Sequence, residues 1–305
     1  MHYAKKFWRT GKLQNSLSNT LTRVNSTIRQ LCCLLLLQVF TTSVFAHSDE
    51  ESSTAHYLAN EGLMVVHGET KVVFDPLFRN SYGRYQLLPK SMEEALIAGN
   101  PPFNGIDAVF ISHYHGDHFS PADVLRLLRS QPNIRLYAPD QAVDALHDVA
   151  SVDDDGIFER VSAVSLAYKD TPVSLEMDGL KIGAVRIPHS GWPTGRLDVE
   201  NISWRVTLDE STTVLHMGDA DPNPVHFERD SGYWHSRVTD MAFPPYWFFD
   251  STYGPGLLEN FIKAKKNVGV HVPISIPTEI SGRPPGLRNN DLFTVPGETR
   301  EIPHE

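Results

Sequence analysis

The run His113-Tyr114-His115-Gly116-Asp117-His118 constrains this chain more than any other stretch. It places three imidazoles and a carboxylate within six residues, directly after an apolar segment, 106–112, that predicts a buried strand. Side chains on a loop that leaves the carboxyl end of a strand are where α/β sheets build their sites. Imidazole and carboxylate together suit zinc and neighbouring metals, so the run predicts a metal site on an α/β fold.

The order of the predicted elements indicates the fold class. Strands and helices alternate in the first half, whereas from residue 157 the chain turns mostly to short strands, with one more helix and strand near the end. This order favours an α/β fold, an αββα sandwich of two mixed sheets packed together with helices on their outer faces. The predicted strands are 63–67, 71–74, 106–112, 134–137, 158–164, 172–177, 180–187, 202–208, 212–217, 268–272 and 292–295, and the predicted helices are 91–98, 121–130, 141–149 and 257–266.

The first 46 residues predict a targeting segment. They contain six basic residues and no acidic ones, followed by an apolar stretch over 31–40 and the sequence Val44-Phe45-Ala46. This layout is typical of a secretory signal cleaved after Ala46, which leaves one domain over 47–305 in the periplasm or outside the cell. The alternative is an uncleaved N-terminal anchor at the membrane, because the basic region is long. Both cysteines, Cys32 and Cys33, lie in this segment, so the mature chain has no thiol ligand or nucleophile.

The net charge argues against polyanionic partners. The whole chain carries a formal charge of −10, and loss of the six basic residues leaves −16 on residues 47–305. We therefore expect no binding to nucleic acid and no stable insertion in a membrane after cleavage. A small-molecule substrate is the expected partner, and the sequence leaves the oligomeric state open.

Further candidate ligands lie at or near the ends of other predicted strands. His189 follows 180–187, Asp219 follows 212–217, and His271 lies within 268–272. Together with the first run they supply five histidines and two aspartates, which is enough for two metal ions.

At these positions the chain resembles the metallo-β-lactamase superfamily. The resemblance extends from about residue 56 to 297 and rests on His113-x-His115-x-Asp117-His118, His189, Gly218-Asp219 and His271. The opening hairpin, which ends in Phe74-Asp75-Pro76, looks most like the branch that contains the ascorbate-phosphate lactonases and the N-acyl phosphatidylethanolamine phospholipases D.

This resemblance implies a role for each of the seven residues. One metal would be held by His113, His115 and His189, the other by Asp117, His118 and His271, and Asp219 would bridge both. It implies two zinc ions about 3.5–4 Å apart, with manganese or iron as alternatives. A hydroxide between the ions would attack a carbonyl carbon or a phosphorus, with Asp117 and Asp219 as the catalytic carboxylates.

Four other side chains are candidates around this centre. Asp75 either orients a ligand histidine through its free ring nitrogen or caps a turn before Pro76. His216 either contacts the site or donates to substrate, or else it is a buried histidine with satisfied hydrogen bonds. Tyr114 and Asn201 are weaker candidates for contacts with substrate.

An aromatic segment, 244–253, contains five aromatic residues within eight positions. With Trp192 it could line the mouth of a pocket for an apolar part of a substrate, and Trp247 is the candidate contact. The alternative is a segment packed on the outer face of a sheet. No basic cluster able to clamp a phosphate is apparent, because Arg186, Arg196 and Arg205 are scattered along the sequence.

These observations predict an exported metal-dependent hydrolase that acts on an ester, lactone or phosphodiester bond. A non-catalytic metal-binding or sensing module is the first alternative, and a β-lactamase is the alternative among enzymes. A di-iron protein that reduces oxygen is disfavoured, because the chain has no room for a flavin domain. Fold does not select the substrate, so the sequence does not identify the bond that is cleaved or the metal that is bound.

Overall fold

The computed structural model describes residues 52–177 and 179–304, and the predicted signal segment 1–46 lies outside them. The described chain contains two seven-stranded sheets. The first sheet has the order β14-β1-β2-β3-β4-β5-β6, and the second has the order β13-β12-β11-β10-β9-β8-β7. The strands of the first sheet are β1 (Ser53–Ala59), β2 (Gly62–His67), β3 (Thr70–Phe74), β4 (Ala108–Phe110), β5 (Arg135–Pro139), β6 (Val161–Val164) and β14 (Thr299–Glu301). Those of the second are β7 (Val173–Met177), β8 (Leu180–Arg186), β9 (Ile202–Leu208), β10 (Thr212–His216), β11 (Met241–Phe243), β12 (Lys266–Gly269) and β13 (Asp291–Leu292).

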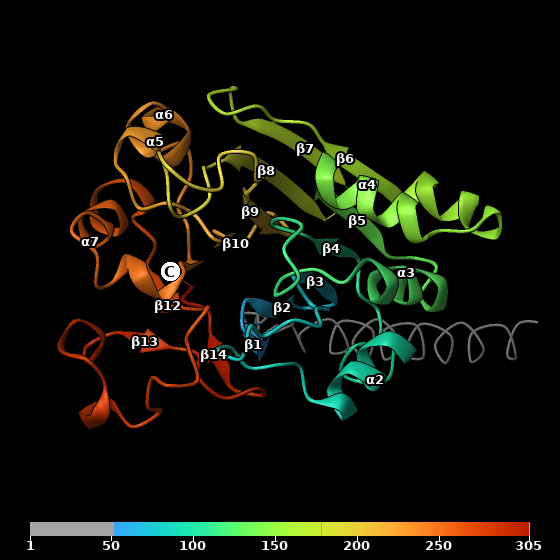
Figure 1. The fold of residues 1–305 in the computed structure, drawn as a ribbon, viewed down its shortest axis with the longest axis horizontal. Coiled ribbons are helices and arrows are strands. Elements are labelled where there is room, and N and C mark those ends of the chain that lie inside the picture. The colour runs from blue at the N-terminus through green and yellow to red at the C-terminus, as the bar shows by residue number, and fades with distance from the viewer. Residues whose placement is uncertain (1–51, 178, 305) are drawn as a thin grey trace, which may run out of the picture. The chain divides into compact units, whose positions relative to one another are not determined.

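Helices cover both outer faces of the paired sheets. Helices α2, α3 and α4 lie on one side and α5, α6 and α7 on the other (Figure 1). The α-helices are α2 (Lys90–Ala98), α3 (Pro121–Ser130), α4 (Asp140–Val149), α5 (Val225–Glu228), α6 (Ser231–Trp234) and α7 (Gly254–Leu257). Short 3-10 helices are η1 (Val152–Arg160), η2 (Tyr246–Phe248), η4 (Ile280–Gly282) and η5 (Pro285–Leu287), and η3 (Leu258–Ile262) is a π-helical turn. The predicted αββα sandwich of two mixed sheets is confirmed.

Three apolar clusters hold these layers together. The central cluster joins the inner faces of the two sheets, with Phe74 and Phe110 from the first and Trp204 and Phe243 from the second. One outer cluster packs α2–α4 on the first sheet, and the other packs α5–α7 on the second. The Trp204 indole also donates a hydrogen bond of 2.9 Å to the Ile111 carbonyl, so it ties the sheets together next to the 113–118 loop.

Strand direction brings the functional loops to one edge. In the first sheet β3 and β4 are parallel. In the second, β8 and β10 both run antiparallel to β9, whereas β10, β11 and β12 are parallel to one another. The loops that follow β4, β8, β10 and β12 carry the candidate ligands, and they meet where the two sheets meet.

Several predicted elements were incomplete or wrong. Strands β1, β11 and β14 were not predicted, and the predicted strand 158–164 begins only at Val161 because residues 152–160 form η1. The acidic run 153–155 lies within η1, and its sequence alone would suggest a solvated surface. Asp154 is buried, accepts hydrogen bonds from the Ser151 amide and hydroxyl, and pairs with Arg129 at 2.7 Å, which favours a helical turn.

The predicted helix 257–266 also differs from the structure. It begins at Gly254, continues through η3, and stops at Lys263, whose φ of 49° is left-handed. Within the described ranges, no helix combines the length and the apolar character that a membrane crossing requires.

Candidate metal centre

The loop after β4 presents its imidazoles toward the seam between the sheets. The amides of His118 and Phe119 both bond to the His115 carbonyl, at 3.0 and 2.9 Å, which makes a tight turn before α3. The Asn80 amide bonds to the Gly116 carbonyl at 2.9 Å and fixes the outer side of this turn. His113 and His118 are fully buried, whereas His115 is partly exposed.

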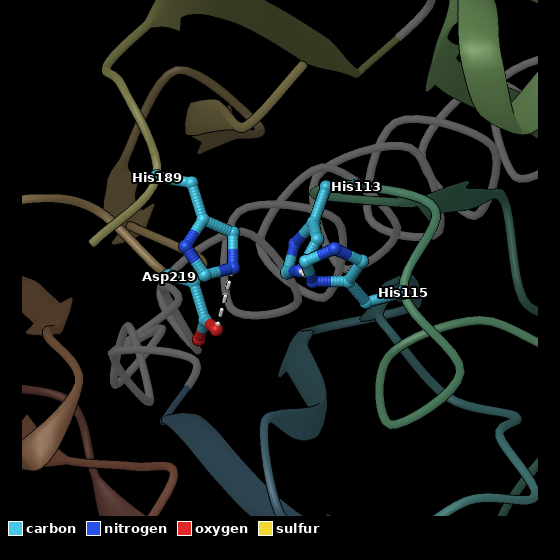
Figure 2. A group of neighbouring side chains, drawn as sticks. All are labelled: His113, His115, His189 and Asp219. Atoms are coloured by element: carbon cyan, nitrogen blue, oxygen red, sulfur yellow. Dashed lines mark hydrogen bonds and ion pairs between the residues drawn. The ribbon is translucent and has the colours of Figure 1, made fainter. Parts of the chain in front are cut away.

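Four residues form the first group of potential ligands. His113, His115, His189 and Asp219 each offer one atom, and these atoms all lie within 4.8 Å of one another. Figure 2 shows the four side chains converging from three separate loops. His113 Nε2 is 3.1 Å from His115 Nδ1, and His189 Nε2 is 3.0 Å from Asp219 Oδ2.

A second group, Asp117, His118 and His271, lies next to the first. His271 Nε2 is 3.2 Å from His118 Nε2 and 3.3 Å from Asp117 Oδ2. The other oxygen of Asp219, Oδ1, is 3.1 Å from His271 Nε2 and 3.4 Å from His118 Nε2. Asp219 therefore faces one group with each oxygen, which is the arrangement that a bridging carboxylate needs.

The polar atoms of these two groups fit metal ions. Two imidazole nitrogens face each other at 3.1 Å in one group and at 3.2 Å in the other. His189 Nε2 and Asp219 Oδ1 are buried, yet within the described part of the chain they make no hydrogen bond of regular geometry, and their close polar neighbours belong to the same two groups. Buried polar atoms are normally satisfied, and a cation between them would satisfy these. Nitrogen and carboxylate donors suit zinc, manganese and iron alike.

Hydrogen bonds behind the ligands fix the orientation of their rings. His189 Nδ1 lies 2.9 Å from the Ser190 carbonyl and donates to it, which leaves Nε2 free for a metal. His118 Nδ1 donates to Asp75 Oδ2 at 2.9 Å. Asp75 is fully buried and also accepts from the Ser112 amide at 2.7 Å and the Ser112 hydroxyl at 2.5 Å. Of the two interpretations of Asp75, the geometry favours orientation of a ligand histidine.

Asn201 has a structural role and is not among the residues that line the open pocket next to the candidate ligands. It is fully buried, and its Nδ2 donates to the carbonyls of Ile187 and Met217, both at 3.2 Å. Its Oδ1 accepts from the Asp219 amide at 2.9 Å. Gly218 makes this approach possible, because its φ is 55° and a Cβ there would lie 2.4 Å from Asn201 Oδ1.

Burial and neighbouring charges set the protonation of the ligands. Burial lowers the pKa of His113 well below its ordinary value and lowers the pKa of His115 to about 4. Both imidazoles are therefore uncharged near neutral pH, the form that binds a metal. Burial opposes ionisation of Asp219, but His271 and His118 hold its pKa well below the usual range. Burial likewise disfavours the charged form of His118, yet Asp219 and Asp117 raise its pKa well above normal. The carboxylates thus attract positive charge to the position a metal would occupy.

Glu61 is a residue of this region that the sequence analysis missed. It is fully buried, and neither carboxylate oxygen has a hydrogen-bond partner among the described residues. Its Oε2 lies 3.9 Å from His118 Nδ1 and 3.6 Å from His216 Nε2. A carboxylate oxygen of Glu61 also lies within 4.8 Å of potential ligand atoms of Asp219 and His271. Burial raises the pKa of Glu61 well above its ordinary value. In the sequence it stands in a turn between strands, so no local pattern marks it.

Two side chains proposed as substrate contacts lie behind the centre. His216 is fully buried, bonds to the Glu61 carbonyl at 2.9 Å, and stacks on Phe74, with ring centroids 5.1 Å apart. Trp247 donates to the Ala220 carbonyl at 3.0 Å, and its ring packs against His271 at 5.3 Å. Neither lines the pocket described below. They support ligand-bearing loops from behind.

The aromatic segment 244–253 does not form an apolar mouth to the site. Phe248 is fully buried in the outer cluster with α5–α7, and Trp247 and Phe249 pack against the same cluster. Pro245 still pairs with Val270 beyond the end of β11, and the chain then turns into η2. Most of the segment thus packs on the outer face of the second sheet, whereas the Tyr246 hydroxyl accepts a hydrogen bond from Arg84.

A polar pocket of about 350 Å³ opens onto the centre. Five candidate ligands line it, together with Tyr82, Arg84, Tyr85 and Arg196. Tyr114 is exposed and does not line this pocket. The structure thus brings two arginines to one place, although they lie far apart in the sequence.

The fold and the paired groups define a metallo-hydrolase architecture with His/Asp clusters able to bind metal. The chain belongs to the β-lactamase superfamily, because a family model described as the beta-lactamase superfamily domain matches residues 70–253. The search of curated proteins finds no match.

Solved structures agree on this fold. The metallo-beta-lactamase fold protein YhfI from Bacillus subtilis is 15% identical, with a TM-score of 0.53 over 82% of this chain and 99% of that one. The isothiocyanate hydrolase from Delia radicum gut bacteria is 16% identical, with a TM-score of 0.52 over 82% and 98%. Igni18, a metallo hydrolase from Ignicoccus hospitalis, is 15% identical, with a TM-score of 0.51 over 83% and 100%. These similarities show the fold and leave the branch of the superfamily a prediction.

Proposed function

We propose that this chain is an exported hydrolase that holds two metal ions and cleaves an ester, lactone or phosphodiester bond of a small molecule. The observation that carries this proposal is the position of Asp219, whose two oxygens face two separate ligand groups at the base of an open pocket. A structural metal site is usually closed by four protein ligands. A pair of sites that opens to solvent supports catalysis over a storage or sensing role.

The residues of the chain would divide the work in the following way. His113, His115 and His189 would hold one ion, Asp117, His118 and His271 the other, and Asp219 both. When bound, a pair of divalent ions supplies Lewis acidity and lowers the pKa of water, which provides a nucleophile near neutral pH. Asp117 and Asp219 offer carboxylate oxygens to the proton of an attacking water. A water activated in this way needs no thiol nucleophile, which suits a chain that has no cysteine after residue 46.

The supporting shell keeps each donor in the form this chemistry needs. Asp75 holds the proton of His118 on Nδ1, and the Ser190 carbonyl holds the proton of His189 on Nδ1. The Asn60 amide group donates to the Asp117 carbonyl at 2.9 Å, and the His271 amide donates to the Asn60 carbonyl at 3.0 Å. One asparagine therefore links a loop of the first sheet to a loop of the second.

The test is hydrolysis by the full chain loaded with zinc, using 4-nitrophenyl acetate, a γ-lactone, bis(4-nitrophenyl) phosphate and a chromogenic β-lactam. We expect turnover of one of the first three, loss of that turnover with a chelator, and recovery with zinc. His115→Ala and Asp117→Ala should each reduce the rate by at least about a hundredfold. His235→Ala is the matched control, because this histidine is exposed, lies outside the pocket, and its side chain bonds among the described residues to the Asn260 carbonyl alone.

Three results would count against the proposal. Full activity of metal-free protein would refute metal dependence. Two bound zinc ions without turnover of any substrate would indicate a binding module. Turnover of the β-lactam alone would identify the other enzyme class.

A further inference from the structure

Two arginines of the pocket, Arg84 and Arg196, are not neutralised by the protein. Across residues 52–177 and 179–304, neither guanidinium lies within ion-pair distance of a carboxylate, whereas Arg79, Arg129 and Arg300 each pair with one at 2.5 to 2.9 Å. Both are instead placed beside the candidate metal ligands.

Each guanidinium is held in place by a neutral group. Arg196 Nη1 donates to the Ser190 carbonyl at 2.9 Å, next to the ligand His189. Arg84 Nη2 donates to the Tyr246 hydroxyl at 3.0 Å, and its Cζ lies 5.6 Å from the centroid of the Tyr85 ring. A guanidinium has five N–H donors, so most donors of each side chain stay free for a ligand.

Packing fixes one of these cations relative to the centre. The Tyr85 ring meets the His271 ring edge-on, with centroids 4.1 Å apart. Arg84, Tyr85 and His271 thus form a continuous row of contacts that runs from the pocket wall to a ligand of the proposed second metal. Arg196 reaches the first metal group through Ser190 and His189.

The charge balance of the pocket differs from that of the whole chain. The protein is acidic, with a formal charge of −10, yet two free cations line this pocket. Its two carboxylates, Asp117 and Asp219, point at the imidazoles of the metal groups and do not contact the arginines. A guanidinium matches the geometry of a carboxylate or phosphate with two parallel hydrogen bonds.

We propose that Arg84 and Arg196 form a subsite for an anionic group of the substrate, a carboxylate or phosphate separate from the bond that is cleaved. The inference rests on the proposed function, since it names the substrate class of the same site. The subsite replaces the apolar contact that the aromatic segment led us to expect, and it selects substrates with a charged end.

The test compares two esters in the full chain loaded with zinc. Mono-4-nitrophenyl succinate carries a free carboxylate, and 4-nitrophenyl acetate does not. Arg84→Gln and Arg196→Gln should each raise KM for the succinate ester about tenfold, since a hydrogen bond to a charged group is lost. The kcat for that ester and both constants for the acetate should change less than about twofold.

The matched control is Arg135→Gln, which removes the same charge from an exposed arginine at the start of β5, the end of that strand opposite the pocket. Zinc content and melting temperature of all variants should equal those of the wild type. Equal KM changes for the two esters, or none, would overturn the inference even though the protein hydrolyses esters.

Binding provides a readout that does not need turnover. Titration of the zinc-loaded protein with succinate, followed by calorimetry, should give a Kd that weakens about tenfold in Arg84→Gln and Arg196→Gln but not in Arg135→Gln. If neither ester is hydrolysed, ester cleavage fails and this titration alone decides the subsite. An unchanged Kd in both variants would refute it.

Discussion

Replacing Asp75 by asparagine should weaken binding of one zinc ion selectively. In the wild type, Asp75 Oδ2 accepts from His118 Nδ1 at 2.9 Å, which keeps a proton on Nδ1 and directs Nε2, the atom that would bind a metal, at Asp219 and His271. An asparagine can still accept from the Ser112 amide with Oδ1. Its NH₂ group then faces His118 Nδ1 and favours the tautomer with a proton on Nε2, which cannot bind a metal.

The magnitude follows from the interaction that is lost. A hydrogen bond between charged partners contributes about 1.5–3 kcal/mol, and each 1.4 kcal/mol is a factor of about ten in affinity. We therefore expect the affinity for one of two zinc ions to fall about ten- to hundredfold, in line with the general effect of groups that orient ligand histidines. The other ion, held by His113, His115 and His189, should bind nearly as before.

The assay is competition for zinc between the protein and a chromophoric chelator, analysed as two equivalents. Asp240→Asn is the matched control, because Asp240 is also a buried aspartate that accepts from a backbone amide, that of Thr213, at 2.7 Å. It pairs with Lys265 at 2.9 Å, far from the ligands in the fold, so this variant should lose stability but keep both zinc affinities. Wild-type affinity for both equivalents in Asp75→Asn would refute the reasoning.

Two further predictions concern stability. Gly218→Ala should lower the free energy of unfolding by about 2–4 kcal/mol, because the new Cβ would lie 2.4 Å from Asn201 Oδ1 and the φ of 55° is left-handed. Gly156→Ala is the control and should change this free energy little, because no atom lies near its Cβ. Equal denaturant midpoints for the two variants would contradict the prediction. The second prediction concerns Asp123, which accepts hydrogen bonds of 2.5 and 2.7 Å from Arg79. Burial opposes ionisation of Asp123, but Arg79 and Ser120 hold its pKa below the ordinary value. The ionised form therefore stabilises the fold above about pH 4 and loses that contribution as the pH falls through the lower folded value. Arg79→Gln should accordingly cost about 1 kcal/mol at pH 7 and less at pH 3 in urea unfolding, and a cost independent of pH would show that the pair does not act through its charge.

Local patterns were sufficient for the parts of the fold that they encode. The hairpin β2–β3, the strand before the histidine run and helices α3 and α4 each carry their own periodicity and end signals. Strands β11 and β14 have three residues each and, unlike β4 in the apolar run 106–112, do not lie within a longer apolar or alternating run. Their pairing with Val214 and Ala55, respectively, is what makes them strands.

The site shows the same division. The run 113–118 could be identified because three imidazoles and a carboxylate within six residues are chemically unusual, and His189, Asp219 and His271 because they complete the pattern of the family that the run resembles. Glu61, Arg84 and Arg196 could not, since each sits in a turn or loop where a charged residue is ordinary. Their significance comes from contacts between distant segments, such as Glu61 with His216, which are 155 positions apart in the sequence.

The division of the ligands between the two sheets has a consequence for how the protein matures. The loop 113–118 is synthesised first, and His271 follows 153 positions after His118. Until the later loops exist and Trp204 has joined the sheets, the early loop lacks His189, Asp219 and His271, which complete the two groups. If the two groups hold two ions, as proposed, the complete pair would be acquired only after the halves of the chain have docked, and occupancy of both sites would report that assembly is complete.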